Sequence, residues 1–324
     1  MLLIIAIIIF YISYQVYQHY FPAPNINPNG KYVLISGCDS GFGQALAIEL
    51  DKLGFNVFAG IFSENNKQLL SSKLSSRAII FPLDITQQKD IDAALQLVQR
   101  KTNILHALVN NAGIITHGYI DCVSVDTMRN LMDVNFFGHV AMTKAFLPLL
   151  IAKQDSRVVN VCSVAGFISG PANSAYSASK FAFESFSDCL RREMGIWGLR
   201  VSIIEPGIMR TPIIEKHGLS VQKLVNELTD DVRQRWGDEY FQRQLEATQN
   251  NILLKYAEDP MKVVRALQHA VVSTAPCIRY RPGWQSKFVF FPLSVVPAWF
   301  TDIFFAKTRK INILPTGLSK QIKA

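Results

Sequence analysis

A tyrosine and a lysine four positions apart, Tyr176 and Lys180, are the side chains whose spacing most directly suggests chemistry. They lie in a segment of mostly small residues, 173–180, and on a helix they would share one face, one turn apart. A phenol has an ordinary pKa of about 10, and a nearby ammonium group favours the phenolate and lowers that pKa. The pair is a candidate proton-transfer device. The same spacing also occurs on solvated helix faces, so this interpretation depends on partners elsewhere in the chain.

A glycine-containing turn near the N-terminus is a candidate phosphate site. The apolar run 31–36 predicts a strand, the sequence Gly-Cys-Asp-Ser-Gly-Phe-Gly at 37–43 predicts a turn, and 44–53 has a helical pattern. Glycine lets the backbone approach a pyrophosphate, and the free N–H groups at the start of a helix favour its negative charge. The turn therefore predicts a dinucleotide site, with an ordinary strand-to-helix turn as the alternative.

Alternating strands and helices organise the rest of the chain and predict a doubly wound, Rossmann-type α/β fold, a parallel sheet with helices on both faces. The polar helical segment 213–256 interrupts this alternation and would lie across the carboxyl ends of the strands, so it is a candidate substrate lid. We expect a single domain at 31–282. Further strands are expected at 56–61, 78–83, 107–110, 157–162, 200–204 and about 277–280, and helices at about 65–73, 88–100, 124–133, 136–152, 175–195 and 260–273.

Apolar segments at the two ends of the chain explain a hydrophobic content of 49%. Residues 1–21 have the length of a short membrane-spanning helix and carry tyrosines toward their end, so we expect an N-terminal membrane anchor. A cleaved signal peptide is the alternative, but the segment lacks a basic start and a small-residue cleavage site. Residues 22–30 contain three prolines and are expected to form a linker.

The C-terminal segment 283–324 contains the apolar stretch 288–305, which is followed by basic residues. Two prolines and an aspartate within this stretch argue against a straight spanning helix. We expect it to dip into the membrane interface, with a core segment that caps the domain as the alternative.

Composition argues against several other classes of protein. The net charge of +8 suits an anionic lipid surface or an anionic ligand, but no basic run interleaved with aromatic residues indicates nucleic-acid binding. The five cysteines are scattered and form no Cys-x-x-Cys pair. We therefore expect neither a disulfide framework nor a metal site.

Four features occur together along the chain: the glycine turn at 37–43, an Asn-Asn-Ala-Gly turn at 110–113, Ser163 directly after a predicted strand, and the Tyr176–Lys180 pair. Together they resemble the short-chain dehydrogenase/reductase family over about residues 31–280. The sequence of the glycine turn and the two apolar ends are similar to the retinol and hydroxysteroid dehydrogenase branch, to which 3-hydroxybutyrate dehydrogenase is also similar. The resemblance implies an alcohol dehydrogenase that uses a nicotinamide dinucleotide.

The resemblance assigns catalytic roles to four residues. It makes Tyr176 the general acid/base that exchanges a proton with the substrate oxygen. Lys180 lowers the pKa of Tyr176 and holds the nicotinamide ribose, and Ser163 hydrogen-bonds the developing alkoxide. Asn135 matches the asparagine that bends a helix and links Lys180 through water to bulk solvent. Read alone, Asn135 is an ordinary polar helix residue and Ser163 an ordinary strand-end serine.

The resemblance also implies which residues contact the cofactor. The glycine turn would hold the pyrophosphate side, Asp84 the adenine, the turn at 111–113 the adenosine, and the residues after the strand 200–204 the nicotinamide end. Asp84 has an alternative interpretation as a strand-end turn former. The expected cofactor-binding residues are Gly37, Asp39, Ser40, Gly41, Phe42, Gly43, Asp84, Asn111, Ala112, Gly113, Tyr176, Lys180, Pro206, Gly207, Ile208 and Thr211.

The sequence favours NAD over NADP, although NADP stays open. The acidic residue usual after the second strand is absent, because 60–64 offers only Glu64, somewhat late. No Arg or Lys stands there to pair a 2′-phosphate, and Asp39 in the glycine turn would repel one.

The expected substrate is a lipophilic alcohol such as a retinoid or a hydroxysteroid, because a membrane anchor stands beside a lid that contains Leu, Ile, Val and Trp236. One alternative is the same chemistry on a small hydroxyacid, for which the lid should offer an Arg or Lys. Another is a non-catalytic dinucleotide-binding module, against which the complete set of four catalytic residues argues. We expect the protein at a membrane, that of the endoplasmic reticulum, with its facing side and a homo-oligomeric state left open.

Overall fold

The structure is a computed structural model of the chain and describes residues 9–10, 13, 20–21, 23–215, 225–226, 228–249, 252–308 and 313–323. Most of the expected anchor at 1–21 lies outside the described residues, and so do 216–224 of the expected lid and 309–312 of the expected basic tail.

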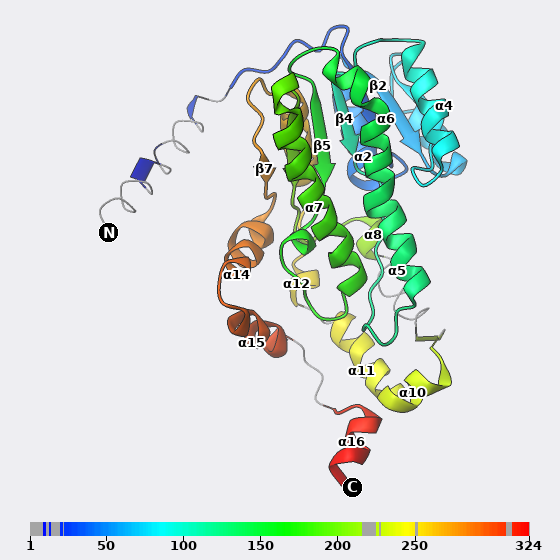
Figure 1. The fold of residues 1–324 in the computed structure, drawn as a ribbon, viewed down its shortest axis with the longest axis vertical. Coiled ribbons are helices and arrows are strands. Elements are labelled where there is room, and N and C mark those ends of the chain that lie inside the picture. Colours follow the sequence, from blue (N-terminus) through cyan, green and yellow to red (C-terminus); the bar gives the residue numbers. More distant parts are fainter. Residues whose placement is uncertain are drawn as a thin grey trace.

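A parallel sheet forms the centre of the molecule, as the alternation of strands and helices predicted (Figure 1). Its strands lie in the order β3-β2-β1-β4-β5-β6-β7 and are short, apolar and rich in β-branched residues, which suits strands covered on both faces. The order reverses beside β1, so the crevice between β1 and β4 opens at the carboxyl ends of the strands. The strands are β1 (Tyr32–Ile35), β2 (Asn56–Ile61), β3 (Ile79–Pro82), β4 (Ala107–Asn110), β5 (Arg157–Val161), β6 (Arg200–Ile204) and β7 (Arg279–Tyr280).

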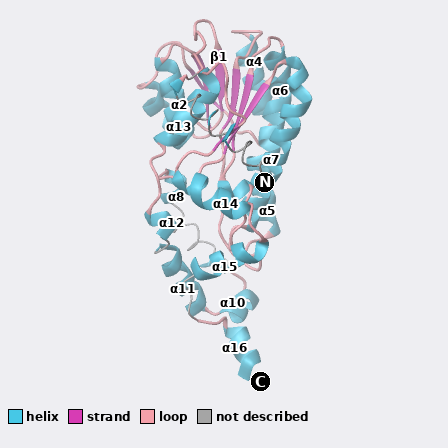
Figure 2. Cartoon of the chain, turned by 90° about the vertical axis from the view of Figure 1, so that its left-hand side faces the viewer, coloured by secondary structure: helices cyan, strands magenta, loops and turns pink. Residues whose placement is uncertain are grey.

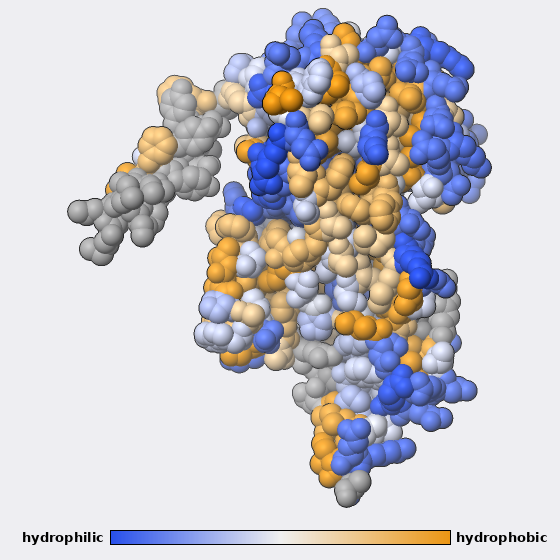
Figure 3. Space-filling model, viewed as in Figure 1, coloured by the Kyte–Doolittle hydropathy of each residue, from blue (hydrophilic) through white to orange (hydrophobic). Residues whose placement is uncertain are grey.

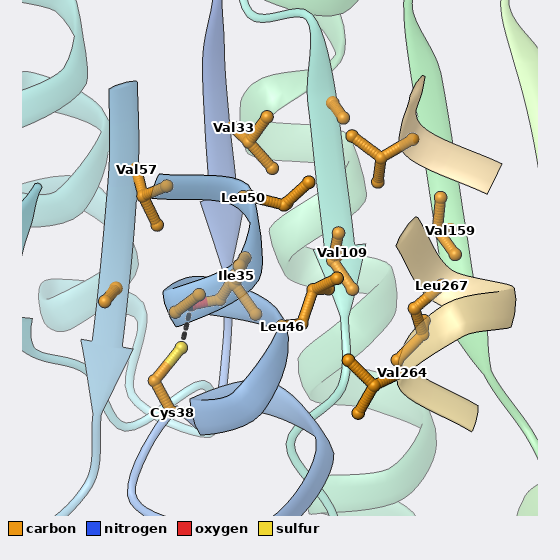
Figure 4. Close-up of a cluster of buried hydrophobic side chains, with 14 of the residues drawn as sticks. Val33, Ile35, Cys38, Leu46, Leu50, Val57, Val109, Val159, Val264 and Leu267 are labelled. Carbon is orange, nitrogen blue, oxygen red and sulfur yellow. Dashed lines mark hydrogen bonds between the residues drawn. The ribbon is translucent and has the colours of Figure 1, made fainter. Parts of the chain in front are cut away.

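Helices cover both faces of the sheet (Figure 2). On one face lie α2 (Gly41–Lys52) and α13 (Met261–Val272), and on the other lie α4 (Gln88–Gln99), α6 (His139–Ile151) and α7 (Ser174–Met194). Alternate residues of a strand point to opposite faces, so Val33 and Ile35 join the core under α2 and α13 while Leu34 joins the other core. Figure 4 shows the first core, in which Leu46 and Leu267 meet the valines of the sheet. Burying each such side chain contributes about 1.5–3 kcal/mol.

One long helical stretch differs from the expected pattern. The sequence predicted two helices at 124–133 and 136–152, but α5 (Val125–Met132) runs through the π-helical turn η2 (Asp133–Gly138) directly into α6. Among the described residues this stretch, Val125–Ile151, is the one helix long and apolar enough to span a membrane, and 44% of its most apolar window is buried inside the protein. It contributes Met142 and Phe146 to the core, so its apolar character is explained by packing.

Short helices gather beyond the carboxyl ends of the strands (Figure 2). One group comes from the predicted lid and a second from the C-terminal segment. The first group is α8 (Pro212–Glu215), α10 (Asp230–Trp236), α11 (Asp238–Gln249) and α12 (Ile252–Lys255), and the second is the π-helical η5 (Gln285–Phe290), α14 (Phe291–Ser294), α15 (Ala298–Thr308) and α16 (Thr316–Lys323). The remaining elements are α3 (Lys67–Ser71) and the 3-10 turns η1 (Glu64–Asn66), η3 (Val164–Gly166) and η4 (Gly195–Trp197).

Candidate active site

A pocket of about 920 Å³ opens at the carboxyl ends of the strands, where the fold predicts ligand binding. It brings together side chains from the glycine turn, the ends of β4, β5 and β6, and the start of α7. All the residues assigned above to catalysis or cofactor binding line it, apart from Asn135 and Gly43, which lie behind its wall. A pocket of this size is large enough for two ligands in line, a dinucleotide and a small substrate.

Tyr176 and Lys180 lie on the same face of α7, as their spacing predicted. The Lys180 ammonium is 5.8 Å from the centre of the Tyr176 ring and donates a hydrogen bond of 3.0 Å to the main-chain oxygen of Val161. Burial lowers the pKa of Lys180, because the charged ammonium is almost fully removed from solvent. The amino group is thus held at the strand end by a carbonyl while it still reaches the pocket.

Ser163 lies beside the Tyr176 phenol. Desolvation is the largest influence and raises the pKa of Tyr176 to about 12, while a hydrogen bond with the Ser163 side chain acts in the opposite direction. The net shift is upward, whereas Lys180 acting alone was expected to lower this pKa. Ser163 Oγ also accepts a hydrogen bond of 3.1 Å from Ala165 N, which orients its hydroxyl group at the end of β5. The two hydroxyl groups therefore meet at one point of the pocket wall.

Asn135 occupies the π-helical turn η2 and is fully buried. Its Oδ1 accepts a hydrogen bond of 2.9 Å from Ile114 N, and its Nδ2 donates to Ile114 O at 2.9 Å and to Ser179 Oγ at 3.1 Å. Ser179 Oγ in turn donates to the main-chain oxygen of Tyr176 at 2.7 Å. Asn135 therefore connects the loop after β4 to the helix that carries Tyr176 and Lys180. π-Helical turns of this kind often occur at functional sites.

The glycine turn has the shape that a pyrophosphate requires. Gly41 has φ of 60° and open space where a Cβ would stand, so its backbone is accessible at the start of α2. Gly43, by contrast, is tightly packed, because an added Cβ would lie 2.4 Å from both Asn111 Nδ2 and Gly37 O. The N-cap residue of α2, Ser40, makes no side-chain hydrogen bond to the N–H groups of the first turn. Those N–H groups and the helix dipole suit an anion, so the residues present fit a dinucleotide.

Asp39 faces the end of β2. Its carboxylate accepts hydrogen bonds of 2.8 Å from Phe62 N and Ser63 N, and one of 3.3 Å from Asn66 Nδ2. A negative charge is thus fixed where the fold usually places an acidic side chain from the strand itself. The sequence analysis did not identify Phe62 and Asn66, which also line the pocket. Both residues follow a strand that ends at the pocket, and this position is the sequence pattern from which they could have been identified.

Two further strand ends complete the cofactor side of the pocket. Asn111 Nδ2 donates to the main-chain oxygens of Ser36 and Gly37 at 3.0 Å, so the turn after β4 is tied to the glycine turn. Asp84 Oδ1 accepts hydrogen bonds from Thr86 N at 2.9 Å and Thr86 Oγ1 at 2.7 Å. Asp84 is therefore a strand-end turn former and also lines the pocket, so both interpretations of this residue have a structural basis.

The far wall of the pocket comes from elements whose individual residues the sequence analysis did not assign. Ile213 and Ile214 of α8 and Leu253 and Leu254 of α12 contribute from the predicted lid. Phe290, Phe305 and Thr308 contribute from the C-terminal segment, which the sequence analysis considered as a core segment that caps the domain only in its alternative interpretation. Trp236 instead stacks on Tyr119 with the ring centres 4.8 Å apart and donates to Asp121.

Comparisons with known proteins identify the family of the chain. The family model described as short chain dehydrogenase matches residues 31–220. Retinol dehydrogenase 16 of Rattus norvegicus is 38% identical over 280 residues, which cover 85% of this chain and 87% of that protein. The 3beta-hydroxysteroid dehydrogenase dhs-16 of Caenorhabditis elegans is 36% identical over 307 residues, 90% of this chain and 78% of that protein. The mitochondrial D-beta-hydroxybutyrate dehydrogenase of Bos taurus is 38% identical over 275 residues, 80% of this chain and 79% of that protein.

Solved structures show the same fold. A short-chain dehydrogenase from Streptomyces avermitilis superposes with a TM-score of 0.68 at 25% identity, over 88% of this chain and all of that one. Fold, pocket, family model and relatives lead to one conclusion: the chain belongs to the short-chain dehydrogenase family and is an NAD(P)-dependent alcohol dehydrogenase.

Proposed function

We propose that this protein is a membrane-associated dehydrogenase that interconverts a lipophilic alcohol, a retinoid or a hydroxysteroid, and its carbonyl compound with NAD(H). The observation that carries this proposal is the set of apolar side chains that α8, α12 and the C-terminal segment contribute to the pocket that also holds Tyr176. A large apolar pocket with a few converging polar groups suits a lipophilic molecule with one reacting hydroxyl group. Relatives named for retinol and for hydroxysteroids support the same substrate class.

In this proposal the polar end of the pocket carries the chemistry. Tyr176 takes the hydroxyl proton during alcohol oxidation and returns it during carbonyl reduction. Ser163, which hydrogen-bonds Tyr176, donates to the substrate oxygen and stabilises its developing negative charge. Lys180 places a positive charge near the phenol and favours the phenolate. When bound, the nicotinamide dinucleotide supplies the hydride acceptor or donor.

The cofactor-binding residues follow from the same pocket. The backbone of the glycine turn at 37–43 would hold the pyrophosphate against the start of α2. Asp84 and the turn at 111–113 would contact the adenosine, and Lys180 the nicotinamide ribose. Pro206, with the other assigned residues of the loop after β6, Gly207, Ile208 and Thr211, would receive the nicotinamide end.

The charge beside β2 supports NAD rather than NADP. The Asp39 carboxylate is held there by three hydrogen bonds, and it would repel the 2′-phosphate of NADP. Among the described residues that line the pocket, Lys180 is the only Lys or Arg, and it lies at the catalytic end. The described pocket wall therefore offers no Lys or Arg beside Asp39 to pair with a 2′-phosphate.

The described pocket wall contains two basic side chains, His117 and Lys180, and no arginine, and this small number favours a lipophilic substrate over a small hydroxyacid. A carboxylate substrate would call for a second cation, because an anion removed from water needs a charged or multiply hydrogen-bonding partner. The similarity to D-beta-hydroxybutyrate dehydrogenase nevertheless makes a hydroxyacid the second candidate.

We further propose that the catalytic domain lies against the membrane of the endoplasmic reticulum through two segments, the anchor at 1–21 with its linker at 22–30, and the C-terminal segment 283–324. Hydrophobic side chains gather on the surface around α14 and α15 (Figure 3). Trp299 is 62% exposed and Phe288 72% exposed, and large apolar side chains so exposed suit a lipid interface. A domain at 31–282, with 213–256 as its lid, would then take its substrate near the membrane surface.

The test is a substrate panel assayed with the purified full-length protein in detergent, with NAD and NADP in parallel. We expect NAD-dependent oxidation of retinoids or hydroxysteroids and little oxidation of 3-hydroxybutyrate. Tyr176→Phe should lower kcat by about 10²–10⁴-fold, the usual contribution of a general acid/base. Tyr32→Phe, at the opposite end of β1, is the matched control and should retain activity. Oxidation of neither lipophilic class, with Tyr176→Phe unchanged, would refute the proposal.

A further inference from the structure

The loop after β6 lines the pocket on one side and rests on the C-terminal segment on the other. Gly207 packs so closely that an added Cβ would lie 3.1 Å from Cβ of Gln285 and 3.2 Å from the main-chain N of Ser286. Gln285 and Ser286 are both fully buried. Ser286 Oγ donates a hydrogen bond of 2.6 Å to the main-chain oxygen of Glu205, at the start of the same loop. Residues beyond the expected domain boundary at 282 therefore support the pocket wall.

Both the oxygen and the nitrogen of the Gln285 side-chain amide form hydrogen bonds that support the loop. Its Oε1 accepts a hydrogen bond of 3.4 Å from Ile208 N. Its Nε2 donates to the main-chain oxygens of Leu253 at 3.0 Å and Tyr256 at 2.9 Å. Leu253 belongs to α12 and lines the pocket. One buried amide group thus joins the loop after β6 to the end of the predicted lid.

Glu258 fixes the backbone around Gln285. Its Oε1 accepts from Gln285 N at 3.2 Å and its Oε2 from Trp284 N at 3.1 Å. The main chain of Glu258 also pairs with the loop, since its N donates to Ile208 O at 2.9 Å and its O accepts from Arg210 N at 2.9 Å. The loop is therefore held by a network of short contacts, and Gln285 lies at its centre.

We propose that Gln285 is a positioning residue that holds the loop 206–211 in the geometry that receives the nicotinamide end of the cofactor. The inference rests on the proposed function, which assigns the nicotinamide end to this loop. Gln285 does not line the pocket, so it acts through Gly207 and Ile208. The adenosine half of the cofactor, bound at the glycine turn and Asp39, is supported by other elements and should not depend on Gln285.

The experiment compares two ligands that differ in the nicotinamide. NADH and ADP-ribose, which lacks that ring, are titrated into the full-length protein in detergent, for the wild type, Gln285→Met and the control Gln99→Met. Gln99 is exposed at the end of α4. We expect Gln285→Met to weaken NADH binding or lower kcat by about tenfold, with ADP-ribose binding changed by less than about twofold, because buried hydrogen bonds at one end of the site are lost.

A second variant keeps the test decisive if Gln285→Met does not fold. Gln285→Glu retains the shape and the acceptor for Ile208 N but sets an oxygen against the carbonyl groups of Leu253 and Tyr256, so it should show the same selective loss. Equal weakening of NADH and ADP-ribose, or no change in NADH binding and kcat, would overturn the proposal. Wild-type protein without dehydrogenase activity would refute the proposed function, whereas the comparison of the two ligands would still test Gln285.

Discussion

Arg279, in the edge strand β7, donates a hydrogen bond of 3.0 Å to Oε2 of Glu184, which lies one helical turn beyond Lys180 on α7. The same guanidinium donates to Oε1 of Glu205 at 2.8 Å, and Glu205 immediately precedes the loop that lines the pocket. Arg281 lies 2.8 Å from the second oxygen of Glu205 and stacks over Phe291 of α14 at 3.7 Å. Buried charge therefore connects the catalytic helix, the pocket loop and the C-terminal segment.

The first prediction concerns the pH dependence of stability. Burial and the neighbouring Glu205 raise the pKa of Glu184 to about 7, against an ordinary value near 4.5, although Arg279 opposes the shift. The folded state then binds more protons than the unfolded state between these values, so the free energy of unfolding falls as pH rises from about 4.5 to about 7. Glu184→Gln removes this titration. Its Tm should change less than that of the wild type between pH 5 and about 7.5. If the Tm of both proteins changes with pH by the same amount, the titration of Glu184 does not contribute to the pH dependence of stability.

The second prediction concerns cofactor preference. Asp39→Ser removes the carboxylate beside β2 and should raise the ratio of kcat/KM with NADP to that with NAD by about tenfold, because the repulsion of a 2′-phosphate is lost. Asp92→Ser, at an exposed position on α4, is the matched control for the loss of one negative charge. A ratio that is the same in both variants would show that Asp39 does not select the cofactor.

The third prediction concerns Asn135. Asn135→Ala leaves the N–H and C=O groups of Ile114 without their side-chain partner at a partly buried site, which costs up to about 1–3 kcal/mol for each unsatisfied group. We expect a lower Tm together with lower kcat, since the loop after β4 and the catalytic helix lose their connection. Asn103→Ala, at an exposed position in the turn before β4, should change neither quantity. Unchanged melting of Asn135→Ala would contradict this role.

The fourth prediction concerns the membrane. Trp299 lies on the exposed side of α15, so lipids with brominated acyl chains should quench its fluorescence in vesicle-bound protein. Trp299→Phe should reduce the quenched fraction of the total emission. Trp197→Phe, which removes an exposed tryptophan from the turn after α7, should leave the quenched signal in place. If the two variants lose the same quenched signal, α15 does not lie in the lipid interface.

The fold could be predicted from the sequence because its evidence is local. Runs such as 56–61 and 200–204 carry the apolar residues of buried strands, and the helices between them carry one apolar face, so a parallel sheet follows from periodicity. The residues that gather in the pocket, among them Ser163, Tyr176 and Lys180, follow strand ends or lie on one helix face. Their meeting follows from the rule that the carboxyl ends of parallel strands share one edge of the sheet.

The sequence by itself determined the sheet, the glycine turn and the spacing of Tyr176 and Lys180, because each depends on residues close together along the chain. Only the tertiary structure decided what surrounds them. Desolvation sets the direction of the Tyr176 pKa, and Gln285, more than 70 residues beyond Ile208, supports the pocket loop through hydrogen bonds that no local pattern encodes. The physical reason is that burial and long-range hydrogen bonds arise from the packing of distant segments, whereas strand and helix periodicity arises within one.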